Sequence, residues 1–169
     1  MVDAANLLDA SPEWTEADRA GWIEWQREYL KWLVESELGK SEAKAFNNHG
    51  TWYDAQVATL AMECGDMETA REVLSSVPER RIAPQIGCDG RQAFELVRTK
   101  SWDYSLFNLE AYCRLARLGG RMDIGLWNWQ SEKCGGIRGA IDYLIPFATG
   151  EEAWKEKQIR DFEPEQLYA

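Results

Sequence analysis

Hydrophobic residues recur at steps of three and four along much of the chain, which is the spacing of one face of an α-helix. The first such stretch follows Thr15, which stands three residues before Asp18 as in a capping box, and extends to about residue 36. Its regularly spaced apolar residues are Trp22, Trp25, Tyr29, Trp32 and Leu33. The pattern predicts an amphipathic helix with an aromatic face, which Gly39 ends.

Helical periodicity also dominates the rest of the chain. A polar connection over residues 40 to 50 is expected to lead into the second helix, and Asp66 is a suitable cap for the third. The further predicted helices span about residues 51–64, 66–77, 104–118, 136–148 and 151–160, the last of them polar. The predicted fold class is therefore all-α, with antiparallel helical hairpins joined by short turns.

Residues 78 to 92 interrupt this regularity. Pro78 should end the third helix, and Pro84 and two glycines follow, which is too many breakers for a helix. The segment also lacks the alternation of a strand, so we predict a long loop, followed over residues 92 to 98 by a short helical or irregular segment. Loops of this length within a compact domain are usually functional or mobile.

Length and composition limit the architecture. A chain of 169 residues with 45% hydrophobic and 28% charged residues is predicted to form one globular domain over residues 1–169. No apolar run approaches the roughly 18 residues that span a bilayer, so no membrane segment is expected. Residues 1 to 15 lack the basic start and apolar middle of a signal peptide, which leaves the localisation open.

The formal net charge of −10 argues against general nucleic-acid binding, which needs a basic face for phosphate contacts. A polyanionic ligand would need a local group of arginines to overcome the surrounding negative field. Arg80, Arg81, Arg91 and Arg98 lie close together in sequence, within and just after the predicted loop. They are either such a group or ordinary solvated charges.

The cysteines exclude some kinds of site. Cys64, Cys88, Cys113 and Cys134 are widely spaced and form no CxxC pair, which argues against a zinc ribbon or a thioredoxin-type centre. Their even number permits two disulfides but does not require them. Cys64 and Cys113 lie within helical patterns, where a free thiol is the commoner outcome.

Two polar clusters carry the residues best suited to chemistry. His49 is the only histidine, and it follows the carboxamides of Asn47 and Asn48 where a helix is expected to begin. An imidazole transfers protons readily near neutral pH. The second cluster begins with Arg98 and ends with Tyr104. Together the two clusters supply a base, an acid and cationic groups.

Four segments along the chain form a recognisable series. They are residues 47–54 (NNHGTWYD), 84–90 (PQIGCDG), 95–99 (ELVRT) and 104–109 (YSLFNL). Their order and spacing resemble the alginate lyase superfamily of α/α toroids over roughly residues 45–148. The likeness is greatest to the branches that cleave mannuronate- or glucuronate-containing polysaccharides. The resemblance implies helical hairpins that form part of an α/α toroid, and a secreted or periplasmic enzyme.

The resemblance also implies β-elimination at a uronic acid of alginate, mannuronan or glucuronan, with no metal and no cofactor. The positions that match the family's catalytic residues are Asn48, His49, Arg98 and Tyr104. Asn48 and Arg98 would neutralise the substrate carboxylate. Tyr104 would donate a proton to the leaving oxygen, and either Tyr104 or His49 would abstract the proton on C5. A phenol that acts as a base needs positive charge nearby, which Arg98 would supply across a turn.

A second group of residues is predicted to contact the acidic polysaccharide. Its members are Trp52, Tyr53, Gln56, Arg91 and Trp102. The aromatic ones would stack on sugar rings, although core packing is the alternative for each of them. Gln56 and Asn108 are also candidates for supporting the catalytic groups.

Three of the four predicted catalytic residues also have a structural alternative. A lone histidine at a helix start often caps the helix or fills a polar niche. Arg98 would alternatively pair with Glu95 on the surface, and Tyr104 would alternatively belong to the core of an apolar helix.

The chain is short for a complete toroid. Hairpins of roughly 35 to 45 residues give three or four pairs here, fewer than a toroid around a sugar-binding cleft uses. We therefore expect an incomplete barrel. The chain is either a portion of a larger enzyme with a missing segment, a naturally shortened relative, or a chain that completes its cleft with a partner. Self-association is expected in the last case, because an arc of helices exposes apolar edges.

Two alternatives to a lyase remain. A uronate-binding remnant would keep the cleft without turnover. A helical-repeat interaction scaffold is suggested by the turn at Gly65-Asp66, although the sequence has no self-similarity at a fixed period. A scaffold would also leave the pair Asn48-His49 unexplained.

Overall fold

The computed structural model describes residues 5, 7–131 and 135–168. Within these ranges the regular structure is helical apart from one isolated antiparallel bridge between Lys100 and Gln158, which confirms the predicted all-α class. None of the described helices combines the length and the apolar character needed to cross a membrane. The elements are η1 (Leu8–Ala10), α2 (Glu16–Glu35), α3 (Glu37–Ala43), α4 (Asn48–Glu63), α5 (Met67–Val77), η2 (Pro78–Ile82), α6 (Ala83–Gln85), α7 (Ala93–Leu96), α8 (Ser101–Gly120), η3 (Leu126–Asn128), α9 (Ile137–Ala148) and η4 (Pro164–Tyr168).

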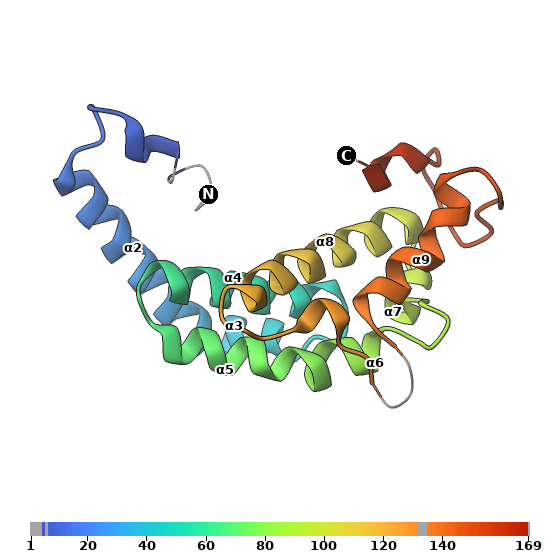
Figure 1. The fold of residues 1–169 in the computed structure, drawn as a ribbon, viewed down its shortest axis with the longest axis horizontal. Helices are drawn as coiled ribbons and strands as arrows, with labels where there is room; N and C mark the ends of the chain where they lie inside the picture. The colour runs from blue at the N-terminus through green and yellow to red at the C-terminus, as the bar shows by residue number, and fades with distance from the viewer. Residues whose placement is uncertain (1–4, 6, 132–134, 169) are drawn as a thin grey trace.

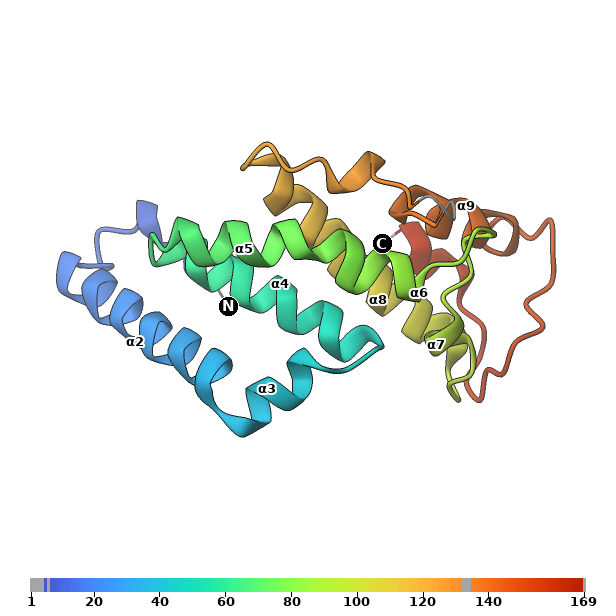
Figure 2. The ribbon, with the colours of Figure 1, turned by 90° about the horizontal axis from the view of Figure 1, so that it is seen from below.

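Helix α4 is the centre of the fold. It packs against α2, α5 and α8, as Figure 1 and Figure 2 show. In Figure 2, α2 and α5 run in one direction and α4 runs between them in the other, so α4 forms an antiparallel pair with each. The small side chains of Ala58 and Ala61 on α4 are fully buried, and the core extends from them to Leu74 of α5 and Leu115 of α8.

Local sequence signals account for the start of two helices. At α2, the hydroxyl of Thr15 accepts a hydrogen bond from the backbone N–H of Asp18 at 3.1 Å, and the Asp18 carboxylate accepts one from the N–H of Thr15 at 3.0 Å. This is the predicted capping box. At α5, Asp66 accepts a hydrogen bond from the N–H of Thr69 at 3.0 Å, as a helix cap does. Both predicted helix starts are confirmed.

Gly39 does not end the first long helix as predicted. Helix α2 ends at Glu35, and Gly39 lies inside α3, which occupies part of the expected polar connection. Ser36 separates the two helices, and its hydroxyl accepts a hydrogen bond from the N–H of Gly39 at 3.0 Å. A Cβ atom at Gly39 would lie 1.9 Å from the carbonyl oxygen of Leu33. Glycine is needed there because α3 turns back closely on α2.

The aromatic residues of α2 lie beside its buried face. The fully or almost fully buried side chains of this helix are Gln26, Leu30 and Leu33. The aromatic residues form a row of stacked rings, with successive centroids 5.1, 5.4 and 6.0 Å apart, in the order Trp22, Trp25, Tyr29 and Trp32. Trp25 and Trp32 are 45% and 47% exposed. The predicted aromatic face is present, but its rings pack on one another and only Leu33 of the expected set is in the core.

The first half of the predicted loop over residues 78 to 92 is helical, whereas residues 86 to 92 are irregular as predicted. Helix α5 ends at Val77 as expected, but Pro78 begins η2, a π-helical turn that leads directly into α6. A proline removes one backbone N–H donor from a helix, and the change from α to π geometry falls at this residue. The segment is therefore part of the packed scaffold.

Arg81 anchors this segment in the interior. Its side chain is 2% exposed, and its Nε donates to the carboxylate of Asp54 on α4 at 2.8 Å. Its two terminal nitrogens donate to the carbonyl oxygens of Ala43 and Ala45, each at 2.7 Å. Arg80 also pairs with Asp54. The alternative of a solvated charge is therefore wrong for Arg81, whose charge is neutralised inside the fold.

Residues 151–160 do not form the predicted polar helix. Their backbone pairs with residues 99–101 through two hydrogen bonds of 3.0 Å. The indole N–H of Trp154 also donates to the hydroxyl of Ser101 at 3.0 Å. The helix propensity of the glutamates and lysines is overridden because these contacts require an extended path along the start of α8.

The cysteines follow the prediction where the structure describes them. Cys64, at the end of α4, and Cys113, on α8, are free thiols. Cys88 is disulfide-bonded. Cys134 lies outside the described residues. Burial raises the pKa of the Cys113 thiol, so this thiol is held in its unreactive protonated form.

Replacing Asp54 by asparagine should remove the buried negative charge that the two arginines share while keeping the shape of the side chain. The Arg81 guanidinium would then be buried without a counter-charge. We expect the free energy of unfolding to fall by about 3–5 kcal/mol, measured by urea denaturation with circular dichroism.

The matched control is Glu110→Gln, which breaks the exposed pair between Glu110 and Arg114 on α8. It should change the free energy of unfolding by about 0.5 kcal/mol or less. Equal effects of the two substitutions would show that Asp54 does not carry the stabilisation assigned to it.

Candidate active site

A pocket of about 420 Å³ lies where the first half of α4 meets the corner between α2 and α3 on one side and α8 on the other. Its lining residues are Leu33, Glu42, Asn48, His49, Trp52, Tyr53, Gln56, Tyr104 and Phe107. Three of the four predicted catalytic residues, Asn48, His49 and Tyr104, therefore share one cavity. They come from the first turns of α4 and α8.

Asn48 is held by a buried carboxylate. Its backbone N–H donates to Oε1 of Glu95 at 2.6 Å, and its side-chain Nδ2 donates to Oε2 of Glu95 at 2.8 Å. Glu95 lies on α7 and is 1% exposed. Because an ionised carboxylate only accepts hydrogen bonds, Glu95 selects the amino end of the carboxamide. The second N–H of Nδ2 is then left for another acceptor.

His49 follows directly and has a different partner. Its Nδ1 lies 2.8 Å from Oε2 of Glu42, near the end of α3. Its backbone N–H donates to the side-chain oxygen of Asn47 at 3.2 Å, and Asn47 is the N-cap of α4. This cap starts α4 at Asn48, three residues before the predicted start at about residue 51. The earlier start places both Asn48 and His49 in the first turn.

Arg98 does not itself line the pocket but contacts the pocket residue Tyr104. Its guanidinium carbon lies 4.0 Å from the centroid of the Tyr104 ring, which is a cation–π contact. The prediction that Arg98 brings positive charge to Tyr104 across a turn agrees with this geometry. The alternative surface pair of Arg98 with Glu95 does not, because Glu95 is buried and bonded to Asn48.

Charges of both signs surround the pocket. Burial raises the pKa of Glu95 above its ordinary value of 4.5, while the N–H groups of Asn48 and the charges of Arg98 and His49 act in the opposite direction. Glu42 adds a second carboxyl group. Arg98 supplies permanent positive charge, in a chain whose net charge is −10.

Trp52, Tyr53 and Gln56, predicted to contact substrate, also line the pocket. The ring of Trp52 is half-buried and lies 4.9 Å from that of Phe107, and its Nε1 donates to the Phe107 carbonyl at 3.1 Å. Tyr53 is 8% exposed and its hydroxyl donates to a backbone carbonyl of α2 at 3.3 Å. Gln56 is exposed and accepts a hydrogen bond from Tyr29 at 3.1 Å. Trp52 and Gln56 therefore offer more accessible surface than Tyr53.

Trp102 and Arg91 do not line this pocket. Trp102 is fully buried, with the rings of Trp154 and Phe162 at 5.1 and 4.8 Å. The prediction that Trp102 stacks on a sugar is wrong, because no face of its ring is accessible. Arg91 pairs instead with Glu156 in the C-terminal segment, so the structure does not bring it to the predicted site.

Asn108 belongs to a buried amide network. Its Nδ2 donates to the side-chain oxygens of Gln85 and Gln92, at 3.0 and 2.8 Å. Gln92 in turn donates to the carbonyl oxygen of Ser105 at 3.0 Å. The network fastens α8 to the segment that leads into α7, and thus supports the positions of Tyr104 and Glu95 from outside the pocket.

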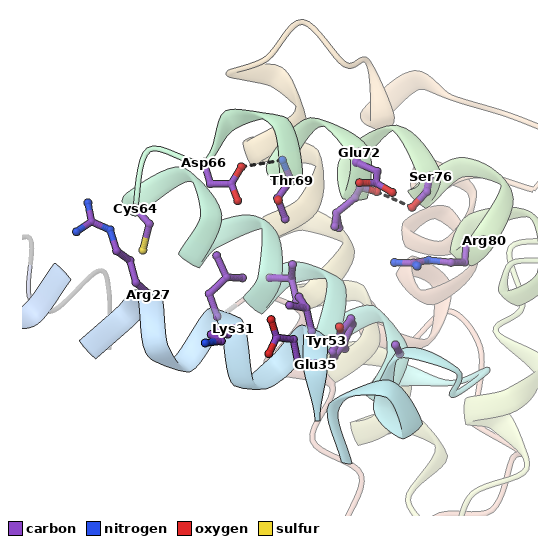
Figure 3. A pocket seen from close by; sticks show the side chains of 15 residues that line it. Arg27, Lys31, Glu35, Tyr53, Cys64, Asp66, Thr69, Glu72, Ser76 and Arg80 are labelled. Atoms are coloured by element: carbon purple, nitrogen blue, oxygen red, sulfur yellow. Dashed lines mark hydrogen bonds between the residues drawn. The ribbon is translucent and has the colours of Figure 1, made fainter. Parts of the chain in front are cut away.

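A larger cavity of about 680 Å³ lies on a neighbouring face of α4. Figure 3 shows side chains of α2, such as Arg27 and Glu35, facing those of α5, such as Glu72, across it. Tyr53 lines both cavities. The four predicted catalytic residues are not among those that line the larger cavity, so we place the candidate chemistry in the smaller one.

The sequence does not identify Glu95 as the partner of Asn48 or Glu42 as the partner of His49. Glu95 belongs to the same short segment as Arg98, but its contact with Asn48 bridges two distant parts of the chain. Glu42 lies in a stretch expected to be irregular, and only the formation of α3 and its corner with α4 brings it to His49.

The fold and the pocket together define a class: an all-helical protein built of helical hairpins, with a carboxamide, an imidazole and a phenol lining one cavity beside a guanidinium. The chain belongs to the alginate lyase family, whose model matches residues 1–154. The predicted family is thereby confirmed.

The chain is also similar to a solved structure, an alginate lyase from Bacteroides ovatus. The two are 30% identical in sequence, with a TM-score of 0.91 over 98% of this chain and 44% of the other. The helical hairpins therefore form part of an α/α toroid, as predicted, and the chain spans less than half the length of that lyase. Among curated proteins no match is found.

Replacing Glu95 by glutamine should change how stability depends on pH. The pKa of Glu95 is raised in the folded protein, so above its ordinary value of 4.5 the folded state keeps a proton that the unfolded chain has lost. As the pH rises from 4.5 toward the raised pKa, the free energy of unfolding of the wild type should fall relative to that of Glu95→Gln.

Urea unfolding of both proteins at a series of pH values measures this difference. Glu37→Gln, an exposed change on α3, serves as the control and should follow the wild type. Parallel pH profiles for the wild type and Glu95→Gln would contradict the raised pKa.

Proposed function

We propose that this chain carries the catalytic pocket of a polysaccharide lyase that cleaves a polyuronate by β-elimination. The observation that carries the proposal is the common pocket of Asn48, His49 and Tyr104, with the Arg98 guanidinium against the Tyr104 ring. Membership of the alginate lyase family supports the same reaction class.

The first requirement of this reaction is to neutralise the substrate carboxylate. Removing the proton on C5 builds negative charge next to a group that is already anionic, so hydrogen-bond donors must meet its oxygens. Asn48 offers the N–H that Glu95 does not take, and Arg98 offers its guanidinium. Removing one such donor typically costs about a hundred- to a thousandfold in rate.

The second requirement is a pair of proton transfers. The C5 proton passes to a base, the bond between C4 and the glycosidic oxygen breaks, a double bond forms between C4 and C5, and the leaving oxygen takes up a proton. We assign donation to the leaving oxygen to Tyr104. Abstraction from C5 is assigned to Tyr104 or His49, according to the face of the ring that carries the proton.

The proposed ligand of the pocket is an acidic polysaccharide: alginate, mannuronan or glucuronan. Trp52 offers a partly exposed ring for a sugar face, and Gln56 offers an exposed amide. A further segment or a second copy that completes the toroid would extend this cleft. This extension is supported by the 44% of the matched lyase that the chain covers.

Incubation of the purified chain with each of the three polymers tests the proposal. Ultraviolet absorbance of the unsaturated product should rise with at least one of them, and no rise at high protein concentration would overturn it. Calorimetry with oligouronates separates the alternative, a binding remnant, which would release heat of binding without product.

Tyr104→Phe should abolish nearly all turnover, because the phenylalanine ring keeps the contact with Arg98 but lacks the hydroxyl that protonates the leaving oxygen. The initial rate of product absorbance measures this loss. Tyr143→Phe is the control, since Tyr143 lies on α9 outside the pocket, and it should retain wild-type turnover. Retention of more than a tenth of wild-type turnover by Tyr104→Phe would contradict the assignment.

His49→Ala should lower kcat by about a hundred- to ten-thousandfold if the imidazole transfers a proton. The measurement is kcat on each polymer, with circular dichroism to verify the fold. The side chain is about half exposed, at 52%, so its loss should leave the fold intact. A decrease of less than tenfold on every polymer would show that His49 only orients the substrate.

A further inference from the structure

The contact between Glu42 and His49 bears on which nitrogen of the imidazole carries the proton, as well as on the position of the ring. Nδ1 of His49 lies 2.8 Å from Oε2 of Glu42, and both side chains line the pocket with Tyr104. A neutral imidazole carries one N–H and one lone pair, and an ionised carboxylate accepts but cannot donate. The nitrogen that faces Glu42 must therefore carry the proton, and the lone pair is left on Nε2.

We propose that Glu42 is a positioning residue, which holds His49 as the Nδ1–H tautomer and leaves Nε2 as the nitrogen that acts on the substrate. The catalytic part of this inference rests on the proposed lyase function, whereas the tautomer does not. In either protonation state of the imidazole Glu42 keeps its hydrogen bond, so it also stabilises the imidazolium that forms when Nε2 takes up a proton.

The backbone on both sides of the contact is held in place. Arg81 donates to the carbonyl oxygens of Ala43 and Ala45, immediately after Glu42. On the other side, the side chain of Asn47 accepts from the backbone N–H of His49 at 3.2 Å. The backbone of the corner between α3 and α4 is therefore fixed from the interior, and the two side chains, each 52% exposed, extend from it toward one another.

The other charged or titratable groups near His49 are engaged elsewhere. Both oxygens of Glu95 accept hydrogen bonds from Asn48. The guanidinium of Arg98 lies against the ring of Tyr104. Glu42 is thus the carboxylate that contacts the imidazole directly. Glu95 and the imidazole interact through space.

The single histidine makes the tautomer directly measurable. In a protein without a histidine tag, NMR of isotopically labelled histidine nitrogens reports on His49 alone. At a pH where the ring is neutral, the wild type should show a protonated Nδ1 and an unprotonated Nε2. Glu42→Ala should move the signals toward the Nε2–H form, because the ring then has no acceptor at Nδ1.

Two further variants sharpen the test. In Glu42→Gln the side-chain oxygen still accepts from Nδ1, so the tautomer should be largely restored without the negative charge. Glu37→Ala removes an exposed glutamate five residues earlier on α3, whose partner is Lys40, and should leave the His49 signals unchanged. An unchanged tautomer in Glu42→Ala, or an Nε2–H tautomer in the wild type, would overturn the proposal.

The kinetic readout follows from the same geometry. Glu42→Ala should lower kcat by about ten- to a hundredfold with little change in KM, and Glu42→Gln should recover part of the loss. Equal kcat values for the wild type and Glu42→Ala on a polymer that His49→Ala cleaves poorly would overturn the positioning role.

Failure of the lyase proposal gives a different pattern. If no polymer were cleaved by the wild type, yet the tautomer changed in Glu42→Ala, the lyase proposal would fail and the assignment of Glu42 as the residue that sets the tautomer would stand. If the wild type cleaved a polymer and the tautomer did not change in Glu42→Ala, the lyase proposal would stand and the assignment of Glu42 would fail.

Discussion

The buried guanidinium of Arg81 joins the parts of the chain on which the pocket depends. It pairs with Asp54 in the middle of α4 and donates to two carbonyl oxygens at the end of α3. A Cβ atom at Gly50 would lie 2.3 Å from Nη1 of Arg81, so the glycine that follows His49 makes room for this clamp. Gly50, which belongs to the motif over residues 47–54, thus serves the scaffold, while its neighbours Asn48 and His49 line the pocket.

Two carboxylates from different elements hold the neighbours Asn48 and His49. Successive residues of an α-helix point in directions about 100° apart, so a single partner does not serve both. Glu95 reaches Asn48 from α7, and Glu42 reaches His49 from α3. The first turn of α4 is therefore held by hydrogen bonds on two sides. The side chains of Asn48 and His49 each keep one polar group for the pocket.

The pocket lies at the starts of two helices. Asn48 and His49 lie in the first turn of α4 and Tyr104 lies in the first turn of α8. The backbone N–H groups of Asn48 and His49 already have side-chain acceptors. The positive charge that favours an anionic ligand therefore comes from Arg98, in a chain whose net charge is −10. The nearby carboxylates of Glu42 and Glu95 limit this attraction, but both are occupied in orienting other groups.

The sequence by itself determined the helical class, the capping box at Thr15, the cap at Asp66 and the family, because periodicity, caps and short motifs are local properties of the chain. It also singled out Asn48, His49, Arg98 and Tyr104 as candidates, since these residues stand within such motifs, and the structure places three of them in one pocket. Only the tertiary structure decided that Trp102 is core, that Arg81 is an internal anchor, and that residues 151–160 run extended beside α8. These outcomes depend on contacts between distant segments, as do the links of Glu95 to Asn48 and of Glu42 to His49. Such contacts leave no periodic signal in a single sequence, because burial and pairing are settled only when the helices pack.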